Sequence, residues 1–216
     1  MVPCIVWDWN GTLLDDVAVS ILARNKVFPK YHLPLLQSEE EYRNIFCFPV
    51  KEYYLRSGIL EKDYATVAQE WFDAYTEYFP QAMLRENAIE ILQYFNSLGI
   101  KQVIISACQK DLLLQQLAYF GVDGFFQDVL ALEDIHAKSK VSLAENYAKK
   151  YAHQYFVVGD TSHDLDMAKA MQAKMIFISN GHESLQKMRL HNQNIVHSLL
   201  DLKNEVNPCL EKDQMV

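Results

Sequence analysis

The stretch CIVWDWNGTLLDD, residues 4–16, decides how the rest of the chain is interpreted. Four apolar residues lead directly into a carboxylate, Asp8, which is the pattern of a buried strand that ends at a polar site. Two residues later comes Asn10, at a place where acid–base chemistry would use a second carboxylate. The stretch therefore predicts a strand that presents a functional carboxylate beside a side chain that cannot titrate.

The composition is that of an ordinary globular protein. The chain has 216 residues, 50% of them hydrophobic and 22% charged, which suits one core with an inserted smaller part. A formal net charge of −8 argues against bulk electrostatic binding of nucleic acid or of an anionic membrane. A small anionic substrate is still allowed, because a metal ion or a few lysines can reverse the charge inside a cleft.

Several features indicate a cytoplasmic protein. No apolar run approaches the roughly 18 residues of a membrane span, and the N-terminus lacks the pattern of a signal peptide. The four cysteines have no metal-finger spacing, so we expect free thiols in a reducing compartment. They are Cys4, Cys47, Cys108 and Cys209.

Short apolar runs alternate with helical patterns along most of the chain. Five runs of four or five residues have the continuous hydrophobicity of parallel strands buried on both faces: Cys4–Trp7, Gln102–Ile105, Val129–Leu132, Tyr155–Val158 and Met175–Ile178. Helices are expected between them, at Glu86–Leu98, Asp111–Phe120 and Ser142–Tyr151, the last opened by a capping box of Ser142 and Glu145. This order predicts an α/β fold with a doubly wound parallel sheet.

One region interrupts the alternation. Residues 17–83 contain no strand-like run, only helical segments rich in aromatic residues: Val17–Tyr31, Ser38–Ile45, Val50–Ser57 and Lys62–Phe79. The sequence therefore predicts a core of residues 1–16 and 84–216 with a small helical domain of residues 17–83 inserted after the first strand.

Polar side chains follow three of the predicted strands. Asp8 follows the first, Ser106 follows the second, and Asp160 comes just after the fourth, with Asp164 four residues further on. Ligands of open α/β sheets bind at the carboxyl ends of the strands, so we expect these side chains to meet there. Crowded carboxylates repel one another, and a hard cation such as Mg²⁺ relieves that repulsion.

These motifs resemble those of the haloacid dehalogenase-like hydrolases. The resemblance rests on Asp8-Trp9-Asn10-Gly11-Thr12-Leu13, on Ser106 after a strand, on a lysine before a helix, and on Gly159-Asp160-Thr161-Ser162-His163-Asp164. It covers nearly the whole chain to about Gly181. The helical insertion is similar to the cap of the phosphoglycolate phosphatase and β-phosphoglucomutase subgroup, and the core of that family is Rossmann-like.

The resemblance implies a role for each motif residue. Asp8 would be the nucleophile that forms an aspartyl-phosphate. Mg²⁺ would be held by Asp8, by the backbone carbonyl of Asn10 and by Asp160, with Asp164 in support. Phosphoryl oxygens would be bound by a group that includes Gly11, Thr12, Ser106 and Ala107, and a lysine would offset developing negative charge. Lys138 and Lys140 both qualify as that lysine, and we prefer Lys140 because it stands just before the predicted helix.

Asn10 departs from the family pattern. Its position is normally an aspartate that protonates the leaving alcohol and then activates water, which is commonly worth about 10²–10⁴-fold. Three interpretations stay open: a phosphatase that is slow or whose leaving group needs little protonation, a hydrolase of C–P bonds similar to phosphonoacetaldehyde hydrolase that uses Lys51 of the cap, or a relative that binds a phosphorylated ligand or a protein without turnover.

The remaining expectations concern the partners of the chain. Arg43 and Lys51 of the cap are candidates for selecting the substrate. We expect a small phosphorylated metabolite as substrate, no nucleic acid or membrane partner, and a monomer or homodimer.

Overall fold

The structure is a computed structural model, and it describes residues 3–133 and 139–213. Six parallel strands form the central sheet in the order β5-β4-β1-β6-β7-β8. They are β1 (Pro3–Trp7), β4 (Lys101–Gln109), β5 (Asp128–Leu132), β6 (Gln154–Gly159), β7 (Lys174–Ile178) and β8 (Asn194–Val196). The predicted doubly wound α/β fold is confirmed.

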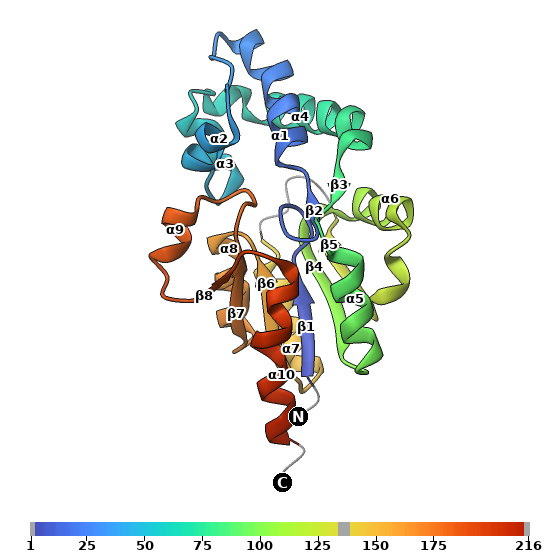
Figure 1. Ribbon diagram of the computed structural model, residues 1–216. Helices are drawn as coiled ribbons and strands as arrows, with labels where there is room; N and C mark the ends of the chain where they lie inside the picture. Colours follow the sequence, from blue (N-terminus) through green and yellow to red (C-terminus); the bar gives the residue numbers. More distant parts are fainter. Residues whose placement is uncertain (1–2, 134–138, 214–216) are drawn as a thin grey trace.

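Helices cover both faces of the sheet (Figure 1). They are α5 (Ala88–Ser97), α6 (Lys110–Phe120), α7 (Val141–Lys150), α8 (Ser162–Ala170), α9 (Leu185–Arg189) and α10 (Leu202–Asp213). Alternate residues of β1 face opposite layers. Ile5 and Trp7 pack in one core cluster with α5 and α6, whereas Cys4 and Val6 pack in another with α7 and α8. Burial on both faces explains why the strands read as continuous apolar runs.

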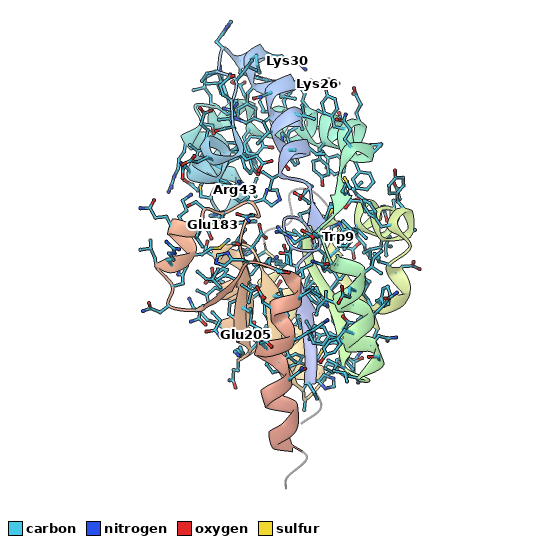
Figure 2. The ribbon with its side chains drawn as sticks, viewed as in Figure 1. Trp9, Lys26, Lys30, Arg43, Glu183 and Glu205 are labelled. Atoms are coloured by element: carbon cyan, nitrogen blue, oxygen red, sulfur yellow. The ribbon has the colours of Figure 1, made fainter. Side chains whose placement is uncertain are left out.

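The segment between β2 (Leu14–Asp15) and β3 (Met83–Leu84) is helical, and we call residues 17–81 the helical insert. It contains α1 (Val17–Val27), α2 (Glu39–Ile45), α3 (Val50–Arg56) and α4 (Tyr64–Tyr78). Lys26, at the C-terminal end of α1, pairs with Glu77 of α4. Lys30, in the turn that follows α1, pairs with Glu70 of α4. Figures 1 and 2 show the insert standing beyond the carboxyl ends of the strands, with Lys26 and Lys30 on its outer part.

The two chain crossings between the insert and the sheet lie side by side. β2 and β3 form a two-stranded antiparallel ribbon in which Leu14 pairs with Leu84 and Asp15 pairs with Met83. Each strand of the ribbon has only two residues, which is too short a run to be recognised as a strand in a sequence, so the sequence does not predict the ribbon. The edge strand β8, three residues long, was missed for the same reason.

Two local expectations are wrong. Helix α7 begins at Val141 with Lys140 as its N-cap residue, and the Ser142 hydroxyl donates to the carbonyl of Ser139, so Ser142 does not open a capping box. The second strand does not end before Ser106, because β4 continues to Gln109. Among the described residues no helix is long and apolar enough to cross a membrane.

Candidate active site

Asp8 lies at the carboxyl end of the central strand β1. Its backbone N–H donates to the carbonyl of Val158 at 2.9 Å, which fixes the residue beside β6. Its side chain is buried, with 5% of the residue exposed. Burial and the charge of Asp164 raise the pKa of Asp8 well above its usual range, and Lys140 partly opposes this rise. The sheet therefore holds a carboxylate where water cannot easily stabilise its charge.

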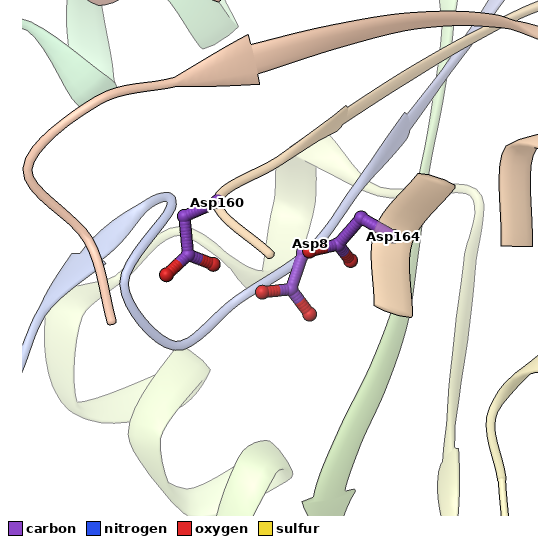
Figure 3. A group of neighbouring side chains, drawn as sticks. All are labelled: Asp8, Asp160 and Asp164. Carbon is purple, nitrogen blue, oxygen red and sulfur yellow. The ribbon is translucent and has the colours of Figure 1, made fainter. Parts of the chain in front are cut away.

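Three carboxylates meet at this edge of the sheet (Figure 3). Asp8, Asp160 and Asp164 each offer an oxygen within 4.8 Å of the others, and all three are buried. The Thr12 hydroxyl lies between two of them, 3.4 Å from Asp8 Oδ2 and 3.2 Å from Asp160 Oδ1. Burial raises the pKa of Asp160 as well, although His182 opposes the rise. The sheet thus brings three carboxylates together where little water reaches them.

Lys140 supplies a cation within this group. Its Nζ lies 2.5 Å from Asp8 Oδ1 and 2.6 Å from Asp164 Oδ1, and only 2% of its side chain is exposed. Burial lowers the pKa of Lys140, but the charges of Asp164 and Asp8 outweigh burial and raise it above the ordinary value. The ammonium is therefore charged at neutral pH. Lys138, the other candidate from the sequence, lies outside the described residues.

Asp164 also opens helix α8. Its Oδ2 accepts hydrogen bonds from the backbone N–H and the hydroxyl of Thr161, at 2.9 and 2.7 Å, so the two residues form a capping box. Its other oxygen is free to accept from Lys140. One side chain thus fixes the helix and orients the lysine.

The loop after Asp8 approaches Asp160 closely. Gly11 has a φ of +72°, and a Cβ at this position would lie 2.3 Å from Asp160 Oδ2, so a side chain is excluded on two grounds. Ser106 lies on β4, next to β1, and its Oγ accepts from the N–H of Cys108 at 3.0 Å. Trp7 pairs with Ile104, so Ser106 and Ala107 lie at the same end of the sheet as Asp8.

The Asn10 side chain is held by two partners. Its Nδ2 donates to Asp16 Oδ2 at 2.8 Å and to the hydroxyl of Tyr75 at 2.9 Å, so both amide hydrogens are used. Tyr75 belongs to α4 of the insert, whereas Asp16 directly precedes α1. The residue that departs from the family pattern is therefore hydrogen-bonded to the residue just before the insert and to the last α-helix of the insert.

Four residues near the site have no role that the sequence assigns to them. Asp16 and His182 form a buried ion pair at 3.1 Å, and Tyr75 donates to the same carboxylate at 2.7 Å. Arg85 donates to the carbonyls of Gly11 and Thr12 and to that of Ser179. The place of His182 beside the motif-bearing loops is readable from the sequence, since it follows β7 at the same edge, but its pairing with Asp16 is not. The other three carry no signal in the sequence, because their contacts depend on how the insert and the chain after β3 pack against the loop that follows β1.

The candidates for substrate selection are engaged elsewhere. Arg43 Nε donates to the carbonyl of Gly181 at 2.8 Å, and its Nη2 donates to the carbonyl of Asn180 at 3.1 Å. Figure 2 shows Arg43 where the insert meets the sheet. Lys51 is exposed on the insert, with its Nζ 2.8 Å from Glu61 Oε1. Arg43 thus joins α2 to the loop after β7, whereas Lys51 pairs within the insert.

The carboxylate group fits a magnesium ion. Mg²⁺ prefers oxygen ligands, usually one or two carboxylates with waters and substrate oxygens. Three buried aspartates with a single lysine among them leave negative charge unbalanced. Burial and the repulsion from Asp164 accordingly raise the pKa values of Asp8 and Asp160. A divalent cation at Asp8 and Asp160 would remove that imbalance.

Comparisons with known proteins agree with this geometry. The family model of the haloacid dehalogenase-like hydrolases matches residues 5–178. The pyrophosphatase PpaX of Bacillus pumilus is 24% identical over 199 residues, which cover 86% of this chain and 88% of the relative. A haloacid dehalogenase-like family hydrolase from Streptococcus pneumoniae has the same fold, with a TM-score of 0.81, 16% identity and coverage of 94% and 98%.

A protein described as a predicted phosphatase from Clostridium acetobutylicum also shares the fold, with a TM-score of 0.80 at 16% identity and coverage of 96% of this chain and 99% of that one. The family model spans most of the chain, from within β1, the strand that precedes Asp8, to the end of β7. This chain therefore belongs to the haloacid dehalogenase-like hydrolases.

Proposed function

We propose that the protein is a Mg²⁺-dependent phosphatase that acts on a small phosphorylated metabolite through an aspartyl-phosphate on Asp8. The observation that carries the proposal is the position of Asp8, buried at the end of β1 between Lys140 and two further aspartates. A carboxylate in such a place is suited to attack, because little water must be removed from it before it meets the substrate.

The reaction has two steps. In the first, an oxygen of Asp8 forms a bond to phosphorus while the bond from phosphorus to the leaving group breaks. In the second, water attacks the same phosphorus, which releases phosphate and restores Asp8. Lys140 offsets the negative charge that develops on the transferred group, and the hydroxyls of Ser106 and Thr12 bind its oxygens.

The magnesium ion would be held by Asp8, Asp160 and the backbone carbonyl of Asn10, with Asp164 in support. When bound, it would neutralise charge on the carboxylates and the phosphoryl group. Asp164 keeps Lys140 oriented by the contact at 2.6 Å.

Asn10 narrows the class of substrate. An amide cannot protonate a leaving oxygen, so substrates whose leaving group is stable as an anion are favoured over alkyl phosphates. Acyl phosphates, enol phosphates and phosphoanhydrides meet this condition. The name of the Bacillus relative, pyrophosphatase, agrees with a phosphoanhydride, since its leaving group is phosphate.

The helical insert serves as the cap in this proposal, with the cap taken as residues 17–83 and the core as residues 1–16 and 84–216. Its position beyond the carboxyl ends of the strands supports this assignment (Figure 1). A closed cap would exclude bulk water from Asp8 and select the substrate by size.

The C–P hydrolase alternative is less well supported. An imine-forming lysine attacks as a neutral amine, so it needs a lowered pKa. The hydrogen bond to Glu61 instead raises the pKa of Lys51, which is exposed. Borohydride trapping with phosphonoacetaldehyde is expected to leave Lys51 unmodified.

The decisive experiment is hydrolysis of p-nitrophenyl phosphate and of a panel of metabolites with and without Mg²⁺. We expect turnover that needs Mg²⁺ and falls by at least about 10³-fold in Asp8→Asn, because that variant has no nucleophile. Asp15→Asn is the matched control, since Asp15 is exposed and lies on the ribbon. Unchanged turnover in Asp8→Asn would exclude Asp8 as the nucleophile.

A further inference from the structure

Asp16 is buried at the centre of a hydrogen-bonded cluster that the proposed reaction does not use. Only 1% of the residue is exposed. Its Oδ2 accepts from Asn10 Nδ2 at 2.8 Å and from the Tyr75 hydroxyl at 2.7 Å. Its Oδ1 accepts from the Gly11 N–H at 2.9 Å and lies 3.1 Å from His182 Nε2. Two partners on each oxygen, each able to donate, match the capacity of an ionised carboxylate.

The cluster joins the loop after β1, the insert and the loop after β7. Asn10 and Gly11 belong to the loop that follows Asp8. Tyr75 belongs to α4, and His182 Nδ1 is 2.9 Å from the hydroxyl of Tyr42 on α2. The Asp16 carboxylate is therefore the shared acceptor through which two helices of the insert contact the loop.

The cluster also dictates what can stand at position 10. Both hydrogens of the Asn10 amide are used, one by Asp16 and one by the Tyr75 oxygen, and the Tyr75 hydrogen is itself given to Asp16. An aspartate at position 10 would place an oxygen about where Nδ2 now lies, facing a carboxylate oxygen with no hydrogen between them. Two such buried like charges disfavour one another strongly.

We propose that Asn10 and Asp16 form a matched pair, in which Asp16 is the positioning residue of the loop 10–12 and requires an amide at position 10. This chain has no carboxylate at position 10 but has one at position 16, and its hydrogen bonds from Gly11 and Tyr75 fix the loop against the insert. The pair can be exchanged in principle: with aspartate at 10 and asparagine at 16, the amide of residue 16 donates to residue 10, and its oxygen still accepts from Gly11 and His182.

The test is a double-mutant cycle of Asn10→Asp, Asp16→Asn and the exchanged double variant. Urea unfolding is measured first, in EDTA and without substrate, so that this part does not depend on the proposed function. Each single variant is expected to lower the folding equilibrium constant by about tenfold or more. The double variant is expected to lose clearly less than the two single losses combined, although it does not restore the charge of residue 16 opposite His182. Asp15→Asn, the same chemical change at the neighbouring exposed position, is expected to leave it unchanged.

Turnover of p-nitrophenyl phosphate is then measured under conditions in which every variant is folded, and this part rests on the proposed function. Both single variants are expected to lose about tenfold or more in kcat, and the exchanged variant is expected to return to within a few fold of the wild type, which mere loss of stability would not produce. If the wild type turns over no phosphate ester, the proposed function fails while the unfolding cycle still tests the pair. Additive losses in the double variant, or a higher kcat in Asn10→Asp alone, would overturn the matched pair.

Discussion

Lys140 shows how much of the site depends on a single residue. It is the cation between Asp8 and Asp164, and all three are almost completely buried. Removing one member of a buried ion group leaves uncompensated charge, which commonly costs more than the group contributed. The lysine that we assign to catalysis is therefore also a structural residue.

We expect Lys140→Met to lower the free energy of unfolding by about 3–5 kcal/mol in the absence of divalent cations, measured by urea unfolding. Lys149→Ala is the control, near the other end of the helix that Lys140 precedes, because its pair with Glu145 is exposed and worth about 0.5 kcal/mol or less. Equal losses in the two variants would show that Lys140 is not held between the carboxylates.

His182 should make stability depend on pH. Burial lowers the pKa of His182, but the charge of Asp16 and its hydrogen bond outweigh burial and raise the pKa to about 9, from an ordinary value of 6.5. The charged form is thus preferred in the folded protein. Its contribution is fully present below pH 6.5 and is lost as the pH rises through 9, and it amounts to about 3 kcal/mol at most.

We expect the wild type to lose more stability than His182→Gln between pH 6.5 and 9, in urea unfolding without divalent cations. The comparison with the variant removes the contributions of the other titrating groups. Parallel pH profiles for the two proteins would contradict the ion pair with Asp16. Asp16 itself contributes at lower pH, because its pKa is lowered by His182 against the opposing effect of burial, so its contribution is lost only as the pH falls.

At the scale of elements, Arg85 joins the chain that returns from the insert to the loop that follows β1. Its guanidinium donates to the carbonyls of Gly11 and Thr12 in the loop after β1 and to the carbonyl of Ser179 in the loop after β7. The planar guanidinium of arginine has donors that point in several fixed directions and can reach all three carbonyls at once, which the compact ammonium of lysine cannot do. Arg85 therefore joins the chain just after β3, the loop after β1 and the loop after β7.

We expect Arg85→Met to lower both stability, by about 2–3 kcal/mol, and kcat, since it leaves buried carbonyls without a partner and frees the loop. Arg85→Lys should recover only part of either loss. Thermal unfolding and phosphatase kinetics on the same samples provide the measurement. Full recovery with lysine would mean that charge alone, and not the three-way contact, is what the position requires.

The elements of the sheet were readable from the sequence because each strand is buried on both faces. Cys4–Trp7 and Tyr155–Val158 are apolar throughout, which is the pattern of short strands that helices cover on both faces. Asp8, Asp160 and Asp164 could be placed together because parallel strands end at one edge. Asp16 and Tyr75 could not, since their contact depends on how α4 packs over the loop, and no local pattern records that packing.

For the whole molecule, the unbalanced charge of the site predicts a response to metal ions. We expect Mg²⁺ to raise the Tm, because an ion that binds only the folded state stabilises it by about 2.7 kcal/mol at a hundred times its Kd. Asp160→Asn should abolish the shift, whereas Asp15→Asn should preserve it. The measurement is a thermal scan in EDTA and in Mg²⁺, and an equal shift in all three proteins would place the ion elsewhere.

The ribbon of β2 and β3 has a consequence for how this architecture can be varied. The chain leaves the sheet layer at Asp15 and returns at Met83, and these two residues face one another in the register of the ribbon. The segment between them is therefore inserted at a single point of the fold, and its length and shape do not affect the pairing of the six strands. The segment can in principle be exchanged for an unrelated module with the strand order left as it is, provided that the new module replaces the contacts of Tyr75 and Tyr42 with the cluster around Asp16.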